Sequence, residues 1–441
     1  MTGKSIESPD RRRLVQTLVA APLAWPFAPP GAAKVTTGRR RVVVVGAGAF
    51  GGWTALALAR SGADVTLVEA HAAGHPRSSS GGETRVIRHM YTDPLYVRMA
   101  ARSLALWREA GRNWGRPLFH QTGVLFMARA EGAGFFDAAY AAMDEEGIGY
   151  RRLDPDAIAQ RWPQIRLDGI EQGAFEAGTG YLLARRACAA VVHAFERAGG
   201  TFRIADARPG PIRGGRLASL ALADGTSLAA DDFVFACGPW LAGLFPELLG
   251  HALKVSRQEV YYFGTPPGDR AHGEAGLPVW ADFGPRLWYG IPGSERRGFK
   301  IADDTHGGPI DPERADRRAS AEGIAAAREY LAMRFPALAG APLVDARVCQ
   351  YTNTADGDFI VDRHPGAANL WLVGGGSGHG FKHGPALGEL AAAGVLAGQL
   401  LEPAFALSRF ETPPPKPSPA GGGGPTAAPS PAGGGGPGWG Q

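Results

Sequence analysis

The chain of 441 residues contains only three cysteines, Cys188, Cys237 and Cys349. Three scattered cysteines do not make the disulfide framework of a small secreted domain. Cys188 lies in a predicted helix and Cys237 follows a predicted buried strand, so both are expected to be small core residues. The hydrophobic share of 45% is ordinary for a globular protein and is enough to build a sizeable core without disulfides.

The chain also has little excess charge of either sign, because 46 Lys and Arg against 42 Asp and Glu give a formal net charge of +4. No Lys/Arg cluster with interleaved aromatic residues lies in its body, so nucleic-acid binding is not expected. Beyond the N-terminal leader no apolar run is long enough to cross a bilayer, which argues against stable membrane insertion. Neither a Ser/His/Asp triad nor a cluster of metal ligands is evident, so no metal site is predicted.

Residues 1–33 have the features of an export signal rather than of a folded segment. Consecutive arginines after Asp10 precede a modest apolar run, Leu14–Phe27, and small residues follow at Gly31–Ala33. The paired arginines predict the twin-arginine route, although Asp10 stands where that motif usually has Ser or Thr. We therefore expect a periplasmic or extracellular protein. The alternative is a basic leader that is not translocated, on a cytoplasmic protein.

A strand, a glycine loop, a helix and a second strand follow one another in residues 42–69. Four consecutive valines are typical of a strand buried on both faces. Gly46, Gly48 and Gly51 then come at the GxGxxG spacing, which permits a tight turn, close approach of backbone N–H groups to a pyrophosphate, and packing of the helix on the sheet. Glu69, about 20 residues further on, can accept hydrogen bonds from a ribose. The pattern predicts a dinucleotide site that does not favour NADP.

The middle of the chain offers basic residues whose roles the pattern leaves open. Arg85 and Arg88 are three residues apart and would share a face on a helical turn, either as a solvated face or as a carboxylate clamp. A helix is predicted over 94–110. Short aromatic segments between 255 and 301 predict a mixed or antiparallel sheet, with Lys300 at a strand position. An exposed sheet lysine is the simpler interpretation of Lys300.

A second strand–glycine loop–helix unit lies near the C-terminal end of the folded part. Leu370–Val373 is the predicted strand, a run that includes Gly376, Gly378 and Gly380 is the loop, and the helix begins at Pro385. Such a loop brings backbone N–H groups and a helix N-terminus to another polar part of the ligand. A nicotinamide cofactor gives no reason for this second unit, whereas a flavin, whose pyrimidine ring gains negative charge on reduction, does.

At this point the chain closely resembles the amine-oxidising flavoproteins of the D-amino-acid-oxidase superfamily, above all the sarcosine and N-methyltryptophan oxidases. The resemblance covers about residues 40–405. It is carried by VVVVGAGAFG, GETRVIRHMY, WYGIPG with the following GFK, CQYTNTADGDFIVDRHP and GGGSGHGFKHGP.

The resemblance implies FAD as cofactor, bound covalently through its 8α-methyl group to the sulfur of Cys349. It implies that Arg88 and Lys382 hold the substrate carboxylate, that Arg85 stacks near the flavin face, and that Lys300 lies where oxygen is reduced. Tyr351 would line the substrate pocket. The complete set of implied cofactor-binding residues is Gly46, Gly48, Gly51, Glu69, Thr84, Arg85, Cys349, Gly376, Gly378, His379, Gly380 and Lys382.

Three positions depart from the sarcosine-specific members of the family. Gly81 and Asp304 stand where those members have histidine, and Trp288 stands where they have tyrosine. These positions are expected to surround the ring system and the pocket, so sarcosine itself is in doubt as the substrate. Retention of both carboxylate-binding cations still indicates an amino acid, secondary or N-alkylated.

The sequence thus predicts an α/β fold with a Rossmann-like FAD-binding domain and a substrate domain built on a mixed or antiparallel sheet. The expected reaction converts the amino acid to an imine that hydrolyses, with O2 reduced to H2O2, in a monomer. The alternatives are a dehydrogenase with a quinone or protein acceptor, and a flavin-carrying binding protein without turnover. The predicted domains are 40–110, 175–240 and 345–405 for FAD, 111–174 and 241–344 for the substrate, and a disordered Pro/Gly-rich tail at 411–441.

Overall fold

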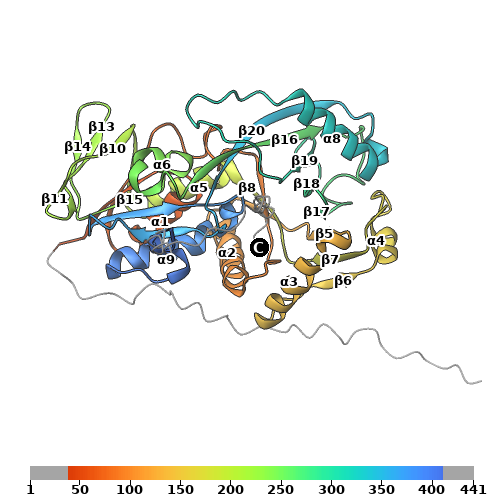
Figure 1. The fold of residues 1–441 in the computed structure, drawn as a ribbon, viewed down its shortest axis with the longest axis horizontal. Helices are drawn as coiled ribbons and strands as arrows, with labels where there is room; N and C mark the ends of the chain where they lie inside the picture. Colours follow the sequence, from red (N-terminus) through yellow and green to blue (C-terminus); the bar gives the residue numbers. More distant parts are fainter. Residues whose placement is uncertain (1–37, 411–441) are drawn as a thin grey trace, which may run out of the picture.

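The computed structural model describes residues 38–410. The predicted leader, 1–33, and the predicted tail, 411–441, lie outside the described residues and stay predictions. Figure 1 shows two large sheets side by side, with α1 (Ala49–Arg60) and α9 (Gly384–Ala397) on one face of the first sheet. The mixed α/β fold predicted from the sequence is confirmed.

The first sheet has six strands in the order β21-β22-β15-β1-β2-β9. Five neighbouring strands pair in parallel, and β21 runs antiparallel to β22 at one edge. β-branched residues dominate the central strand, and both of its faces are covered, which is the usual setting of a parallel strand. The strands are β1 (Arg41–Val45), β2 (Asp64–Glu69), β9 (Thr201–Ile204), β15 (Asp232–Phe235), β21 (Ile360–Arg363) and β22 (Leu370–Gly374).

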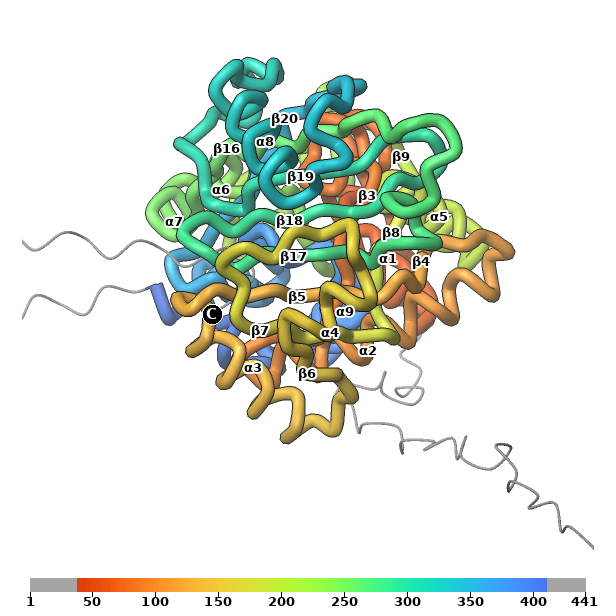
Figure 2. The backbone as a smooth tube through the Cα atoms, turned by 90° about the vertical axis from the view of Figure 1, so that its right-hand side faces the viewer, coloured from red at the N-terminus to blue at the C-terminus, as the bar shows by residue number. Residues whose placement is uncertain are grey.

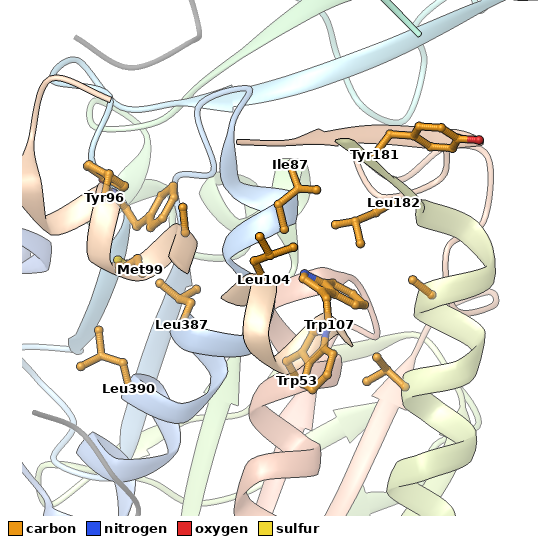
Figure 3. Packing of buried hydrophobic residues seen from close by; sticks show 14 of the residues in the cluster. Trp53, Ile87, Tyr96, Met99, Leu104, Trp107, Tyr181, Leu182, Leu387 and Leu390 are labelled. Atoms are coloured by element: carbon orange, nitrogen blue, oxygen red, sulfur yellow. Dashed lines mark hydrogen bonds between the residues drawn. The ribbon is translucent and has the colours of Figure 1, made fainter. Parts of the chain in front are cut away.

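Helices pack against this sheet through small residues and aromatic rings. Helix α9 approaches α1 closely because Gly388 has no side chain; a Cβ there would lie 2.7 Å from the Cβ of Trp53. The indole of Trp53 meets that of Trp107 edge to face, with ring centroids 5.0 Å apart (Figure 3). The helices of this layer are α1 (Ala49–Arg60), α2 (Pro94–Asn113), α5 (Ala184–Arg197) and α9 (Gly384–Ala397).

A three-stranded sheet, β3-β8-β4, connects the two large sheets. Its strands are β3 (Thr84–Ile87), β4 (Phe119–His120) and β8 (Gly180–Leu183). The prediction that Arg85 and Arg88 share a helical face is wrong, because Arg85 lies in a strand and Arg88 directly follows it. Side chains alternate between faces along a strand, so residues three apart point to opposite sides. The two arginines consequently serve different parts of the site.

The second large sheet has eight strands in the order β20-β16-β19-β18-β17-β5-β7-β6. All neighbours are antiparallel except β17 and β5, as the predicted mixed sheet requires. Figure 2 shows these strands following one another across the face of the molecule. They are β5 (Val124–Ala128), β6 (Arg151–Leu153), β7 (Gln172–Glu176), β16 (Lys254–Phe263), β17 (Val279–Phe283), β18 (Trp288–Ile291), β19 (Phe299–Asp303) and β20 (Leu343–Asn353).

The other elements cover the rims of the two sheets. One of them bears on the site: the 3-10 turn η4 (Gly380–His383) leads from the second glycine loop into α9. The other helices are α3 (Ala133–Glu145), α4 (Pro155–Arg161), α6 (Leu241–Leu244), α7 (Pro246–Leu249) and α8 (Ala321–Arg334), with short 3-10 turns at η1 (Ala130–Gly132), η2 (Gly238–Trp240), η3 (Pro336–Leu338), η5 (Pro403–Phe405) and η6 (Leu407–Phe410). The small strands are β10 (Ala207–Pro209), β11 (Ile212–Arg213), β12 (Arg216–Leu217), β13 (Leu220–Leu222) and β14 (Ser227–Leu228).

The predicted two-domain division stays a prediction, and one of its boundaries cuts an element. Residue 345 falls inside β20, whose residues pair along their length with β16 of the eight-stranded sheet. This long strand carries Cys349 and Tyr351, so it brings residues of the larger sheet to the glycine loops. Within residues 38–410, no helix is both long enough and apolar enough to cross a membrane.

Candidate functional site

A cavity of about 710 Å³ lies where the two large sheets meet. The first glycine loop, Glu69, the second glycine loop and Tyr351 all line it. The volume is in the range that holds an organic cofactor. Two loops far apart in the sequence therefore border one cavity, as the repeated strand–glycine loop–helix pattern predicts.

The three glycines of the first loop have distinct geometries. Gly46 has φ +101°, and a Cβ there would lie 2.5 Å from the carbonyl oxygen of Ala236. A Cβ on Gly51 would lie 2.0 Å from the carbonyl oxygen of Gly46, so the start of α1 can pack on the loop only with glycine. Gly48 borders the cavity, where the absence of a side chain leaves the backbone N–H groups of the loop open to a ligand.

Glu69, at the end of β2, lines the cavity together with Gly46 and Gly48. Its carboxylate accepts hydrogen bonds from the backbone N–H groups of Ala47, at 2.9 Å, and His71, at 3.1 Å. The sequence pattern did not single out Ser80, whose Oγ accepts a hydrogen bond from the N–H of Ala49 at 3.1 Å. Ser80 sits in a Gly/Ser-rich loop without a recognisable spacing, so only the fold reveals its contact with the start of α1.

In the second loop, Gly376, Gly378 and Gly380 line the cavity, but His379 does not. The His379 ring is buried and stacks on Phe359, with ring centroids 4.9 Å apart. Burial lowers the pKa of this imidazole well below its ordinary value. The placement does not support direct contact of His379 with the cofactor, and the residue is better described as part of the wall behind the site.

Cys349 and Tyr351 point to the same side of β20 because they are two residues apart on a strand. The sulfur of Cys349 lies 3.4 Å from Nη2 of Arg85, and both residues border a smaller pocket next to the main cavity. Cys237, which was expected in the core, is half-buried and lines the main cavity. Cys188 is buried, as predicted.

Lys300 lies on β19 with a fully buried side chain, so the interpretation as an exposed sheet lysine is wrong. Its Nζ donates a hydrogen bond to the carbonyl oxygen of Thr84 at 3.3 Å and lies 5.1 Å from the ring centroid of Tyr289. Burial, together with the positive charge of Arg85, lowers the pKa of the ammonium to about 7. The hydroxyl of Thr84 is buried without a hydrogen-bond partner among the described residues.

Arg88 and Lys382 meet at Tyr91, a residue that the sequence pattern did not single out. The guanidinium carbon of Arg88 lies 4.0 Å from the centroid of the Tyr91 ring, and Nζ of Lys382 donates a hydrogen bond to the Tyr91 hydroxyl at 2.7 Å. Nζ of Lys382 also donates to the carbonyl oxygen of His379 at 2.7 Å. Burial and the neighbouring Arg88 charge lower the pKa of Lys382 well below its ordinary value. Two cations thus converge in one buried place.

Glu176, also missed from the sequence, holds the backbone that presents Arg88. Its carboxylate accepts hydrogen bonds from the N–H groups of His89 and Met90, each at 2.9 Å, and contacts Nδ1 of His89 at 3.0 Å. Arg88 itself donates to the carbonyl oxygen of Met90. A single glutamate at the end of a short strand carries no sequence signal for this role.

The three departures from the family pattern lie in different surroundings. A Cβ on Gly81 would lie 2.0 Å from the carbonyl oxygen of His75, so no larger residue fits this loop without a backbone shift. The expectation that Trp288 borders the pocket is wrong, because its ring stacks on Tyr330, with centroids 4.7 Å apart, in the core behind the sheet. The next residue, Tyr289, faces Lys300 instead, because side chains alternate along β18.

Asp304 directly follows β19 and contacts Tyr351 of the cavity lining. Its side chain is buried, and Oδ1 accepts a hydrogen bond from the hydroxyl of Tyr351 at 2.6 Å. Burial raises the pKa of this carboxyl to about 7, while the hydrogen bond from Tyr351 and the positive charges of Arg88 and Lys382 act in the opposite direction. Among residues 38–410, no group of three or more His, Cys, Asp or Glu residues could hold a metal ion.

The arrangement as a whole defines a flavin-dependent oxidoreductase: a dinucleotide cradle with two glycine loops, and two buried cations that meet at Tyr91. Residues 41–393 match the family model described as DAO, FAD dependent oxidoreductase. The chain belongs to this family. It is an enzyme of the sarcosine-oxidase and N-methyltryptophan-oxidase type, as the sequence predicts.

Two curated relatives and one solved structure illustrate the similarity. Peroxisomal sarcosine oxidase of Mus musculus is 31% identical over 359 residues, covering 79% of this chain and 90% of the relative. N-methyl-L-tryptophan oxidase of Salmonella newport (strain SL254) is 30% identical over 378 residues, covering 84% and 97%. The crystal structure of L-proline dehydrogenase from P. horikoshii has a TM-score of 0.74 at 21% identity, covering 85% of this chain and 98% of that one, and shows the shared fold.

The residues present fit FAD. The cavity is lined by a GxGxxG loop and by a second glycine loop, which offer the backbone donors that a diphosphate and a flavin ring need. The buried hydroxyl of Thr352, in the cavity wall, has no hydrogen-bond partner among the described residues and is available to a ligand. Glu69, Gly48 and Gly376 would hold the cofactor along this cavity.

Proposed function

We propose that the protein oxidises a secondary or N-alkylated amino acid to an imine, which hydrolyses in water, and reduces O2 to H2O2. The observation that carries the proposal is the convergence of Arg88 and Lys382 on Tyr91. Two buried cations around one side chain suit an anionic ligand, and an amino acid brings a carboxylate. The names of the curated relatives support an amine as the group that is oxidised.

In this proposal the cations bind and orient the substrate. The Arg88 guanidinium offers two parallel N–H groups to a carboxylate, and the Lys382 ammonium adds a point charge. Tyr91 fixes the Lys382 ammonium through its hydroxyl, so the site is organised before the substrate arrives. The bound FAD supplies the redox chemistry, because it accepts two electrons from the carbon–nitrogen bond and passes them to oxygen.

Lys300 is proposed to act where oxygen is reduced. Its ammonium is buried on β19, in a different element from the substrate cations, and is held at the carbonyl of Thr84. A fixed cation in a water-poor site stabilises negative charge that develops on oxygen, and removal of one such group typically costs about 10²–10³ in rate. A pKa of about 7 means that this charge is present below neutral pH and is lost above it.

We further propose that the FAD is attached to the sulfur of Cys349. Cys349 shares a strand face with Tyr351, which lines the cavity, and the Arg85 guanidinium lies 3.4 Å from the sulfur. Acid precipitation of the purified protein tests the attachment: colour in the pellet supports it, and colour in the supernatant rejects it.

The activity is tested by mixing the holoenzyme with N-methyl and cyclic amino acids without oxygen and recording the loss of flavin absorbance. Bleaching followed by H2O2 formation on admission of air is the expected result. Bleaching with dye reduction but little H2O2 would favour a dehydrogenase that uses a quinone or protein acceptor. A flavin that no amine bleaches would favour the binding protein without turnover.

A further inference from the structure

The carboxylate of Asp304 is buried beside Tyr351 of the cavity lining, and the charges of Arg88 and Lys382 act on it. We propose that Asp304 accepts the proton that a zwitterionic amino acid loses from its ammonium group before oxidation. This inference rests on the proposed function and deepens it, because it names the ionic form of the substrate that the pocket takes up. It also gives Asp304 a catalytic role, because the residue would touch the reacting nitrogen.

The contacts of Asp304 place its carboxylate next to Tyr351, a residue of the cavity wall. The backbone N–H of Asp304 donates to the carbonyl oxygen of Leu287 at 2.8 Å, which fixes the residue to the chain just before β18. Its side chain is held by the 2.6 Å hydrogen bond from Tyr351, whose ring lines the cavity. That bond is accepted by Oδ1, and in the proposal Oδ2 accepts the hydrogen bond from the ammonium group of the substrate.

The charges around Asp304 match both ends of an amino acid. Arg88 and Lys382 attract the substrate carboxylate, and both also act on the Asp304 carboxyl through their charges. The ammonium nitrogen of an α-amino acid is separated from its carboxylate by a single carbon. A ligand held by the two cations thus brings its ammonium group near a carboxylate that is coupled to them. A buried carboxylate without such a cationic ligand carries an unfavourable desolvation energy.

The chemistry of the step is a simple proton transfer. One N–H bond of the ammonium group breaks, its electron pair stays on nitrogen, and the proton forms an O–H bond with Asp304. No electron is exchanged, and the amine that results has the lone pair that oxidation needs. A general base works best when its pKa lies near the working pH. Burial places the pKa of Asp304 at about 7, which suits this role.

Other groups also act on the Asp304 carboxyl and must be separated from it in any pH profile. Tyr351, which donates a hydrogen bond to this carboxyl, is the one that lines the cavity. The charged and titratable groups coupled to it are Asp303 and Lys300 on β19, Tyr289 on β18, Tyr351 on β20, Arg88 and Tyr91 after β3, and Lys382 in η4. His306, exposed and with its ring centroid 5.9 Å from that of Tyr351, offers a control because it titrates nearby without touching Asp304.

The first test is the pH profile of anaerobic flavin reduction at low substrate concentration in Asp304→Asn holoenzyme. The wild type should lose rate as pH falls through about 7, because Asp304 becomes protonated. In Asp304→Asn this limb should vanish, and the rate should instead rise with pH towards the pKa of the substrate amine. At pH 7 the second-order rate constant should fall on the order of 10²–10⁴-fold. Asp304→Glu should restore the limb, and His306→Gln should leave the profile unchanged.

The second test moves the limb without removing the carboxylate. The hydrogen bond from Tyr351 lowers the pKa of Asp304, so Tyr351→Phe should shift the acidic limb to higher pH. An acidic limb that stays at the same pH in Asp304→Asn and in Tyr351→Phe would overturn the proposal. Asp304 would then be a structural carboxyl that only balances the charge of the pocket.

The third test needs binding alone, so its outcome does not depend on turnover. Propionate carries a carboxylate but no amine, and its binding can be followed through the melting temperature of the holoenzyme. Ionised Asp304 should repel propionate, so Asp304→Asn should bind it more tightly than the wild type above about pH 7 and about equally at about pH 5. Equal binding at both pH values would contradict the proposal. If no amino acid reduces the wild-type flavin, the proposed function fails, while this titration still reports on Asp304.

Discussion

The glycine-lined cavity and the cluster of buried cations beside it are built in different ways. At Gly46 and Glu69 the cavity wall comes from one short stretch of chain, and backbone geometry decides its shape. The cation cluster is assembled from side chains that are far apart in the sequence, Arg88 and Lys382, which meet at Tyr91. Backbone sites therefore depend on the space that glycine leaves free, whereas side-chain sites depend on burial and charge.

The largest effect should come from a side chain added at Gly46, in the first glycine loop. Gly46→Ala places a Cβ 2.5 Å from the carbonyl oxygen of Ala236 at φ +101°, so we expect about 3–5 kcal/mol of destabilisation and loss of bound flavin. Gly62→Ala is the matched control, because Gly62 has φ +91° but no atom within 4 Å of the place that a Cβ would take. It should cost only about 1–2 kcal/mol. Unfolding and flavin content measure both, and equal losses would contradict the steric explanation.

In the cation cluster at Tyr91, loss of one cation should affect substrate binding more than folding. Arg88→Gln removes the paired donors for a carboxylate and should lower kcat/KM on the order of 10²–10³-fold, equivalent to about 3–4 kcal/mol. Arg88→Lys keeps the charge but not the two parallel donors, and should recover only part of the loss. Steady-state kinetics with the best amino acid of the screen measure the series. Equal rates in all three proteins would remove Arg88 from the site.

Lys300 on β19 and Asp304, which directly follows this strand, should change the stability of the protein with opposite dependence on pH. The folded pKa of Asp304 is raised to about 7, so wild-type stability falls as pH rises from about 4 to 7, where only the unfolded chain releases this proton. The advantage of Asp304→Asn in melting temperature should therefore grow over this window and stay constant above it. A shift of this size corresponds to at most about 4 kcal/mol.

The same reasoning has the opposite sign for Lys300. Its folded pKa is lowered to about 7, so wild-type stability rises between about pH 7 and 10.5, where the unfolded chain retains the proton that the native protein has lost. The advantage of Lys300→Met should be greatest below about pH 7 and disappear near pH 10.5. Melting curves over about pH 4 to 10 measure both variants, and parallel curves for the two would contradict the assignment.

The smallest effect should come from Glu69. Glu69→Gln keeps an oxygen that accepts from Ala47 but loses the charge-assisted bonds to a ribose, so affinity for FAD should fall about tenfold. The measurement needs Cys349→Ser as the background, because a covalent bond would hide dissociation. Fluorescence of released FAD reports the affinity, and the rate of flavin reduction should not change.

The sequence predicts most of what is local and little of what depends on tertiary contacts. The GxGxxG loop, the helix at 94–110 and the second glycine loop all follow from short-range patterns, and the structure has them. Two wrong predictions share a cause, because the face on which a side chain lies depends on a local structure that the sequence pattern did not define. Arg85 lies in β3 and Arg88 directly follows it, and the Trp288 ring packs in the core while its neighbour Tyr289 faces Lys300.

Residues that act through long-range contacts carried no signal. Tyr91 and Glu176 are ordinary residues in the sequence, and only the folded chain brings them to Lys382 and to the backbone beside Arg88. His379 lies in a glycine loop whose backbone borders the cavity, yet its ring turns into the aromatic wall behind it. A motif thus predicts where a loop lies more reliably than where each of its side chains points.

The central claim, that Arg88 and Lys382 hold the carboxylate of an amino acid during oxidation, is tested most directly with one matched pair of compounds. An N-methyl amino acid that bleaches the flavin is compared with its primary amide, which has the same amine but no negative charge, by anaerobic stopped-flow absorbance. The amino acid should reduce the flavin at least about 10²-fold faster at low concentration, because paired buried charges contribute about 2–5 kcal/mol. Equal rates for acid and amide would contradict the account.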